Sequence, residues 1–171
     1  TRPFIAISKL LNGYGFSAPR VFKVDRLNGF LILEDFGNET YTKALSEDKD
    51  ELCLYHLAID LLINLGRRNY KEEITFLPKY DSLKFLEEVV LFLDWYLVPR
   101  LKILVSDSMR KEFLSLWEIC LKQFVDGSQS ILVLRDYHVD NLMHLSDRDN
   151  LGSCGLLDFQ DAVQGPASYD V

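Results

Sequence analysis

The sequence predicts an α/β (α+β) fold in two unequal parts: residues 1–36 combine one helix with a β-hairpin, and residues 37–171 are mostly helical. The first observation is a change of hydrophobic period at Gly37. Apolar residues alternate before it, as in strands, and recur every three or four residues after it, as in helices. The second observation is that three short apolar runs near the C-terminal end are each flanked by a polar residue. The change of period places a boundary between two lobes near residues 33–37, and the three flanked runs belong to the larger, second lobe.

The N-terminal part begins with a helix predicted over Arg2–Tyr14, where apolar side chains form one stripe and a Gly-Tyr-Gly sequence ends it. A β-hairpin follows. Apolar residues between 21 and 24 lead to Asn28-Gly29, which is favoured in tight turns, and residues 30–33 form the returning strand. That strand passes directly into residues 34–37, where the pattern changes.

A long helix is predicted over residues 48–69, and its apolar residues lie nearly all round it. Such a helix is typical of the centre of a bundle, so we expect it to be buried. The pattern Asp48-x-x-Glu51 resembles a capping box at its start. Arg67 and Arg68 suit the negative end of the helix dipole, although a pair of arginines could also bind a substrate phosphate.

Two further helices precede the C-terminal strands. One starts near Leu83 and is expected to break near Pro99. The other, residues 107–125, carries its apolar residues on one face and is expected to stop at Asp126-Gly127. Large aromatic residues on such helices favour a role in the core over one as a platform for a sugar; here they are Trp95, Tyr96 and Trp117.

The three short apolar runs near the C-terminal end deliver polar residues at their ends. Residues 131–134 run into Arg135 and Asp136, Asn141 stands directly before the second run, and residues 155–157 end at Asp158. A packed core has no use for a carboxylate at these positions, because burying an unpaired charge is costly. A single Asp at a strand end is commonly a cap or turn residue, but the ordered set favours a functional site.

Phosphoryl transfer requires these residue types. One carboxylate orients the attacking hydroxyl and accepts its proton, and hard oxygen ligands hold Mg²⁺ on the phosphates of ATP. An Asp followed five residues later by an Asn, and then by Asp-Phe after a strand, is the arrangement of the catalytic and metal loops in kinases. On this interpretation Asp136 is the catalytic base, and Asn141 and Asp158 are the metal ligands.

Two other functions use the same residues. A metal-dependent hydrolase would use Asp136, His138 and Asp158, and a degenerate kinase-like protein would bind a ligand without catalysis. His138 and His144 could suggest a metal site, but they lack the helical spacing of zinc peptidases and no cysteine cluster accompanies them. We expect His138 to brace the loop by hydrogen bonding and His144 to lie at the surface.

The segments LRDYHVDNLM and GLLDFQDAVQGPASYD resemble the aminoglycoside phosphotransferase family of small-molecule kinases. Within it they look most similar to bacterial kinases that phosphorylate N-acetylmuramate and N-acetylglucosamine at the anomeric hydroxyl. The family's Asp, Asn and Asp fall on Asp136, Asn141 and Asp158. Two departures are that Leu134 stands where the family usually has His, and that Gln160 replaces the glycine of the protein-kinase Asp-Phe-Gly motif.

The resemblance implies a protein-kinase-like two-lobe fold, with a partial N-lobe (residues 1–36) and a mostly helical C-lobe (residues 37–171). It implies ATP-dependent phosphorylation of a small-molecule hydroxyl, the acceptor being an amino sugar or aminoglycoside-like. The resemblance also makes Asp170 a residue that ties the catalytic loop in place. The family's glycine-rich loop and strand lysine are not found, so we expect the sequence to be an internal part of a longer kinase.

The same resemblance places the nucleotide-binding hinge at four consecutive residues, Leu33, Glu34, Asp35 and Phe36. Their backbone groups would meet the adenine. The alternative is that Glu34 and Asp35 simply begin a solvated loop.

Composition excludes several partners. With 19 basic and 26 acidic residues the net charge is −7, which argues against nucleic acid because phosphate contacts need a basic face. No apolar run reaches membrane-spanning length and no signal peptide is seen, so no membrane partner is expected. Three widely spaced cysteines form no disulfide framework, which predicts a reducing, cytoplasmic location.

Overall fold

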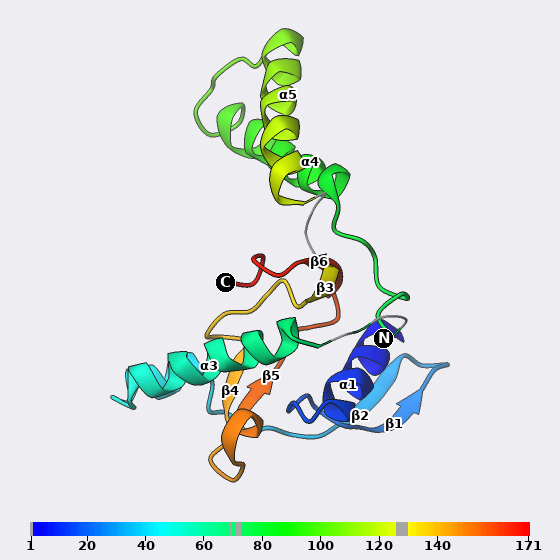
Figure 1. Cartoon of the computed structure of the whole chain (residues 1–171), viewed down its shortest axis with the longest axis vertical. Helices are drawn as coiled ribbons and strands as arrows, with labels where there is room; N and C mark the ends of the chain where they lie inside the picture. Colours follow the sequence, from blue (N-terminus) through cyan, green and yellow to red (C-terminus); the bar gives the residue numbers. More distant parts are fainter. Residues whose placement is uncertain (1, 69, 71–72, 126–129) are drawn as a thin grey trace.

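The computed structural model describes residues 2–68, 70, 73–125 and 130–171. Figure 1 shows a lower body, in which α1, α3 and the short strands lie together, and a helical hairpin of α4 and α5 that stands away from it. The expected stop of the last long helix at Asp126-Gly127 lies outside the described residues. The mixture of helices and small antiparallel sheets confirms the predicted α+β class.

The elements follow one another as α1 (Arg2–Gly13), β1 (Val21–Asp25), β2 (Phe30–Leu33), α2 (Tyr41–Ser46), α3 (Glu51–Gly66), α4 (Ser82–Leu91), the π-helical segment η1 (Phe92–Leu97), α5 (Asp107–Phe124), β3 (Ser130–Val133), β4 (Leu142–His144), the 3₁₀ turn η2 (Asn150–Ser153), β5 (Cys154–Leu156) and β6 (Val163–Pro166). The described strands pair antiparallel as β1 with β2, β3 with β6, and β4 with β5.

The N-terminal helix and hairpin form where the sequence predicts them. Helix α1 buries Ile7 and Leu11 against the core. The turn between β1 and β2 places Gly29 at φ 76°, a left-handed conformation that glycine adopts without a steric penalty. Because the register pairs Val21 with Leu33, the hairpin delivers the expected hinge to the edge of the lower body.

Helix α3 differs from its prediction, because only one of its faces is buried. Leu54, Ala58, Leu61 and Leu65 lie at helical spacing and face the core. The opposite face is exposed; its large apolar residues are Leu52, Tyr55, Ile59 and Ile63. The expectation of burial all round is therefore wrong for the described residues.

The cap of α3 also differs from the expected capping box. Asp50, not Asp48, is the N-cap residue, and its carboxylate accepts a hydrogen bond from the Cys53 N–H at 3.1 Å. Asp48 has a φ of 56° and belongs to the preceding turn. At the other end of the helix, the Arg68 guanidinium donates to the Tyr14 carbonyl at 3.1 Å. Arg68 thus joins the ends of α3 and α1.

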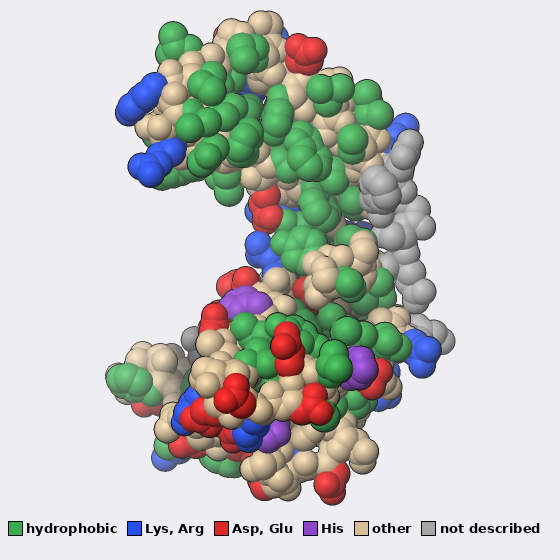
Figure 2. All heavy atoms as spheres, turned by 90° about the vertical axis from the view of Figure 1, so that its left-hand side faces the viewer, with side chains coloured by type: hydrophobic (Ala, Val, Ile, Leu, Met, Phe, Trp, Pro, Cys, Tyr) green, Lys and Arg blue, Asp and Glu red, His purple; other side chains and the backbone are tan. Residues whose placement is uncertain are grey.

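The hairpin of α4, η1 and α5 contains the two predicted helices, but their apolar faces are not buried in a core. Phe92 stacks on Tyr96 and Phe113, and Phe113 contacts Trp117 edge to face. Much apolar surface stays exposed; its large members are Leu91, Phe92, Trp95, Tyr96, Leu104, Met109, Leu116, Trp117 and Ile119. Figure 2 shows hydrophobic side chains gathered on the hairpin, above a hollow that separates it from the lower body on that face. The prediction of a core role for these aromatic residues is wrong.

The hinge segment is fixed to the lower body by Arg148, which follows β4. Its guanidinium donates to Glu34 Oε1 at 2.7 Å and to Ser17 Oγ at 2.8 Å. The same group lies over the Phe36 ring, 4.9 Å from its centroid. A Cβ at Gly155 would come within 2.9 Å of Phe36, so a glycine in β5 lets this ring approach the strand. The segment after β2 is therefore held against the β4–β5 hairpin.

The buried face of α3 gives a matched test of packing. Leu61 is fully buried, whereas Leu52 on the same helix is 69% exposed. We expect Leu61→Ala to lower the free energy of unfolding by about 2–5 kcal/mol, because it leaves a cavity in the core. Leu52→Ala should cost less than about 1 kcal/mol. Urea unfolding of both variants measures the difference, and equal losses would contradict the burial of Leu61.

Glu34 makes stability depend on pH. Hydrogen bonds from the Arg20 side chain, with the charge of Arg148, lower the pKa of Glu34 from 4.5 to about 2. Since the folded-state pKa lies below the unfolded one, this stabilisation is complete above pH 4.5 and is lost as the pH falls toward 2. We expect this stabilisation to be about 1–3 kcal/mol. Glu34 is only 12% exposed, which strengthens its contacts, but Arg20 is 64% exposed, so solvent screening weakens the pair.

The check is urea unfolding of wild type and Glu34→Gln between pH 7 and pH 2.5. The glutamine variant should be less stable at pH 7 and should lose less stability on acidification. Parallel pH profiles would show that Glu34 titrates alike in the folded and unfolded chains.

Candidate active site

The loop between β3 and β4 is anchored at its start by a carboxylate. Asp170 accepts the N–H of Leu134 at 2.7 Å and the N–H of Arg135 at 2.8 Å. Burial raises the pKa of Asp170, and the nearby charge of Asp136 raises it further, while the two N–H donors lower it. Asp170 thus ties the loop in place, as expected, and its neighbour Asp136 is exposed on that loop.

Arg135, which directly precedes Asp136, has a left-handed backbone with φ 74°. A residue with a Cβ rarely adopts this conformation, and it persists only where the surroundings hold it. Here the N–H is held by Asp170, and the guanidinium forms an ion pair of 3.0 Å with Glu88 of α4. The turn at Arg135 directs the chain out of β3 and presents Asp136 at the strand end.

Asn141 closes the same loop onto Asp136. Its Nδ2 group donates to the Asp136 carbonyl at 3.0 Å and lies 3.2 Å from His138 Nε2. His138 Nδ1 in turn accepts the N–H of Asp140 at 3.3 Å. The expectation that His138 braces the loop is confirmed. With Nδ2 engaged in this way, Oδ1 is the atom of Asn141 available to a cation.

Asp158 lies at the same end of the β4–β5 hairpin as Asn141. The register pairs Leu142 with Leu156, and one step further the Leu157 N–H donates to the Asn141 carbonyl at 2.9 Å. Asp158 follows with a left-handed φ of 54°, and Gln160 Nε2 donates to its Oδ1 at 2.5 Å. The structure thus brings the Asn and the second Asp of the predicted set together across one hairpin.

The residue after Asp158 fixes this second loop to the N-terminal part. Phe159 is buried, and its ring stacks on Phe4 of α1 with centroids 4.9 Å apart. The loop that carries Asp158 is therefore held by the hairpin on one side and by α1 on the other.

Asn141 and Asp158 are chemically suited to Mg²⁺. Amide and carboxylate oxygens are hard ligands, and Mg²⁺ is usually bound through one or two carboxylates together with phosphates and water. Asn141 Oδ1 and Asp158 Oδ2 accept no hydrogen bond from the described residues. The described residues contain no group of three or more His, Cys, Asp or Glu that could hold a metal ion. Asn141 and Asp158 thus offer two oxygen ligands that could hold Mg²⁺ together with other ligands.

His144 is not the surface residue that was expected. Its side chain is largely enclosed, and Nδ1 lies 3.1 Å from Lys49 Nζ and 3.4 Å from Glu39 Oε1. This cluster joins the end of β4 to the turn before α3. His144 is thus occupied in a structural contact away from Asp136.

The side chains of the predicted hinge residues Glu34 and Asp35 have different environments. The carboxylate of Glu34 is held by Arg20 and Arg148, so the alternative that Glu34 begins a solvated loop is wrong. Asp35 is exposed, and its Oδ1 accepts the Gly37 N–H at 2.8 Å, which shapes the turn out of the hinge. Contact between these residues and a nucleotide stays a prediction. Arg148 was not found from the sequence, because its partner Glu34 lies 114 positions away.

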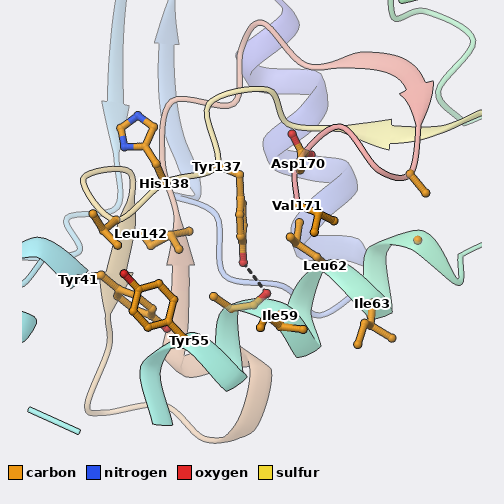
Figure 3. A pocket seen from close by; sticks show the side chains of 14 residues that line it. Tyr41, Tyr55, Ile59, Leu62, Ile63, Tyr137, His138, Leu142, Asp170 and Val171 are labelled. Carbon is orange, nitrogen blue, oxygen red and sulfur yellow. Dashed lines mark hydrogen bonds between the residues drawn. The ribbon is translucent and has the colours of Figure 1, made fainter. Parts of the chain in front are cut away.

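An apolar cavity of about 530 Å³ lies between the loop that joins β3 to β4 and the exposed face of α3. Figure 3 shows Tyr137 reaching across it toward α3, where its hydroxyl donates to the Ala58 carbonyl at 2.8 Å. His138 and Asp170 also border the cavity, but Asp136 does not. The cavity is therefore distinct from the polar site, and Tyr137 anchors the loop to α3.

In the part of the chain that the structure describes, no helix is long and apolar enough to cross a membrane.

The chain is similar in sequence to curated kinases. The chain is 35% identical over 171 residues to an N-acetylmuramate/N-acetylglucosamine kinase of Pseudomonas aeruginosa, covering 99% of this chain and 47% of that protein. It is 34% identical to a protein of the same name from Pseudomonas putida, with the same coverage. The chain thus spans about half the length of the curated relatives it matches.

Solved structures agree on the fold. The GDP complex of aminoglycoside 2'-phosphotransferase-IIIa matches with a TM-score of 0.65 and 15% identity, over 98% of this chain and 58% of that one. A GDP and kanamycin complex of APH(2")-IIia matches with a TM-score of 0.64 and 17% identity, with the same coverage. The predicted two-lobe, kinase-like fold is thereby confirmed. The profile of the phosphotransferase enzyme family matches residues 1–171, and the chain therefore belongs to that family.

Proposed function

We propose that the protein transfers a phosphoryl group from ATP to a hydroxyl of a small molecule, and that the acceptor is an amino sugar. The observation that carries the proposal is the convergence of Asp136, Asn141 and Asp158 at the ends of β3 and of the β4–β5 hairpin. A chain that matches the phosphotransferase family along its whole length presents them in the order that phosphoryl transfer needs.

Each residue has a separate role in this proposal. Asp136 is the base: its carboxylate accepts the proton of the acceptor hydroxyl as that oxygen bonds to the γ-phosphorus and the bond to ADP breaks. Asn141 and Asp158 hold Mg²⁺, which when bound neutralises charge on the phosphate oxygens. The backbone of Leu33, Glu34, Asp35 and Phe36 receives the adenine, and Arg148 keeps that segment in place.

The acceptor class is supported by the names of the relatives, which are kinases of N-acetylmuramate and N-acetylglucosamine. The α4–α5 hairpin adds a physical argument. Trp95, Tyr96 and Trp117 are exposed there, and flat aromatic faces suit the apolar side of a sugar ring. We place the reaction in the cytoplasm, because the cysteines of the chain are free and ATP is the phosphoryl donor.

The metal-dependent hydrolase is the weaker alternative. It would need Asp136, His138 and Asp158 to bind a metal without a nucleotide, but His138 is engaged with Asn141 and Asp140. A binding protein without catalysis does not account for the strained turn at Arg135 or for the exposed Asp136 beside it.

The test of the function is an assay of phosphate transfer from ATP to amino sugars and aminoglycosides, using the protein made from its complete coding sequence. Asp136→Asn should lower kcat by about two to four orders of magnitude, because a general base typically contributes on that scale. Nucleotide affinity should stay near the wild-type value, since Asp136 touches the acceptor. Turnover within a few-fold of wild type would show that Asp136 is not the base.

Asp158→Ala tests the division of roles. Removal of a charged ligand should weaken the binding of nucleotide with Mg²⁺, and leave binding without Mg²⁺ almost unchanged. Calorimetry with and without Mg²⁺ measures the increment that depends on the metal. Asp136→Asn serves as the control and should keep that increment; equal losses in both variants would contradict the assignment.

A further inference from the structure

We infer that Glu88 is a positioning residue, which couples the α4–α5 hairpin to the catalytic base through Arg135. The inference rests on the proposed function, since it assigns the base to Asp136. Glu88 lies in α4, 47 positions before Arg135 in the sequence, and it touches neither Asp136 nor the metal ligands in the described contacts. Its effect on the reaction must therefore pass through the residue next to the base.

Tyr80 contacts both members of the ion pair between Glu88 and Arg135. Arg135 Nη2 donates to Glu88 Oε1 at 3.0 Å, and the two side chains are 29% and 31% exposed. The other carboxylate oxygen of Glu88 accepts a hydrogen bond from the hydroxyl of Tyr80, which is buried. The Arg135 guanidinium also lies over the Tyr80 ring, 5.5 Å from its centroid. Glu88, Tyr80 and Arg135 thus hold one another in a single geometry.

A second path runs from Tyr80 to the same loop. Tyr80 contacts the Tyr169 ring edge to face, with centroids 4.9 Å apart, and the two hydroxyls are 3.4 Å apart. The next residue, Asp170, accepts the N–H groups of Leu134 and Arg135. The cluster around Glu88 therefore reaches Arg135 through its side chain and, by way of Tyr169 and Asp170, through its backbone.

Arg135 is sensitive to such contacts because of its left-handed backbone, φ 74°. The conformation is unfavourable for a residue with a Cβ, so it relaxes where its restraints are removed. A relaxed Arg135 would change the direction in which Asp136, the next residue, leaves the strand. Small displacements of a base relative to the attacking oxygen have large effects on rate.

The α4–α5 hairpin is the element whose change of position would reach Asp136 through these contacts. It stands away from the lower body in Figure 1 and carries the exposed aromatic residues proposed to meet the sugar. The position of the hairpin is thereby linked to the position of the base. An acceptor that binds to the hairpin would thus change the position of Asp136 through the contact between Glu88 and Arg135.

The experiment compares two neighbouring glutamates of α4 in the protein made from its complete coding sequence. Glu88→Ala should lower kcat about ten- to a hundredfold, while the KM for ATP stays within about twofold of wild type. Glu87→Ala is the control: Glu87 is 68% exposed, and among the described residues its ion pair is with Lys84, one turn away. It should leave kcat and both KM values within about twofold.

A double variant and a structural readout complete the design. Arg135→Ala should lower kcat as Glu88→Ala does, and the double variant should lose no more than either alone, because both act through one contact. Glu88→Gln, which keeps the shape of the side chain, serves if Glu88→Ala does not fold. Hydrogen exchange of residues 131–141 should be faster in the Glu88 variant than in the Glu87 variant.

The outcomes separate this inference from the proposed function. If the wild type phosphorylates an acceptor and the Glu88 and Glu87 variants have equal kcat values, the coupling is overturned and the proposed function stands. If the wild type phosphorylates no acceptor, the proposed function fails, and hydrogen exchange alone decides on the contact. Unchanged exchange of residues 131–141 in Glu88→Ala would then overturn it.

Discussion

The site depends on one carboxylate, that of Asp170, which accepts two consecutive backbone N–H groups where the chain leaves β3. These two N–H groups lie beyond the paired residues of β3, and buried backbone N–H groups need hydrogen-bond partners. By binding both, Asp170 holds Arg135 in its left-handed turn and fixes the direction of the loop that follows. Burial raises the pKa of this carboxyl, whereas the two N–H donors lower it.

From this anchor the remaining contacts form a continuous path. The loop returns through the hydrogen bond of Asn141 to the Asp136 carbonyl, and the β4–β5 pairing carries it to Asp158. Arg148 then joins this hairpin to Glu34 at the hinge. The proposed base, the proposed metal ligands and the predicted hinge are thus all connected to one small hairpin of three-residue strands, and neither of its strands is long enough to be rigid alone.

The sequence predicted what is local and missed what is not. Asp136 and Asp158 could be found from the sequence because each comes within two residues of the end of an apolar run, and the Asn28-Gly29 turn could be found because two residues specify it. The ion pairs of Glu88 with Arg135 and of Glu34 with Arg148 join residues 47 and 114 positions apart, and no periodicity records them. For α3 and α5 the helices were predicted correctly, but which apolar face meets the core depends on the neighbouring elements.

Two non-glycine residues of the proposed site have left-handed backbones: Arg135, which precedes the proposed base, and Asp158, a proposed metal ligand. An Asp tolerates this conformation better than most residues, whereas an Arg does not. The arginine therefore needs the larger set of restraints, and it has them: a carboxylate on its N–H, a carboxylate on its guanidinium, and an aromatic ring beneath it. These contacts hold Arg135 in a conformation that sets the direction in which Asp136 leaves β3.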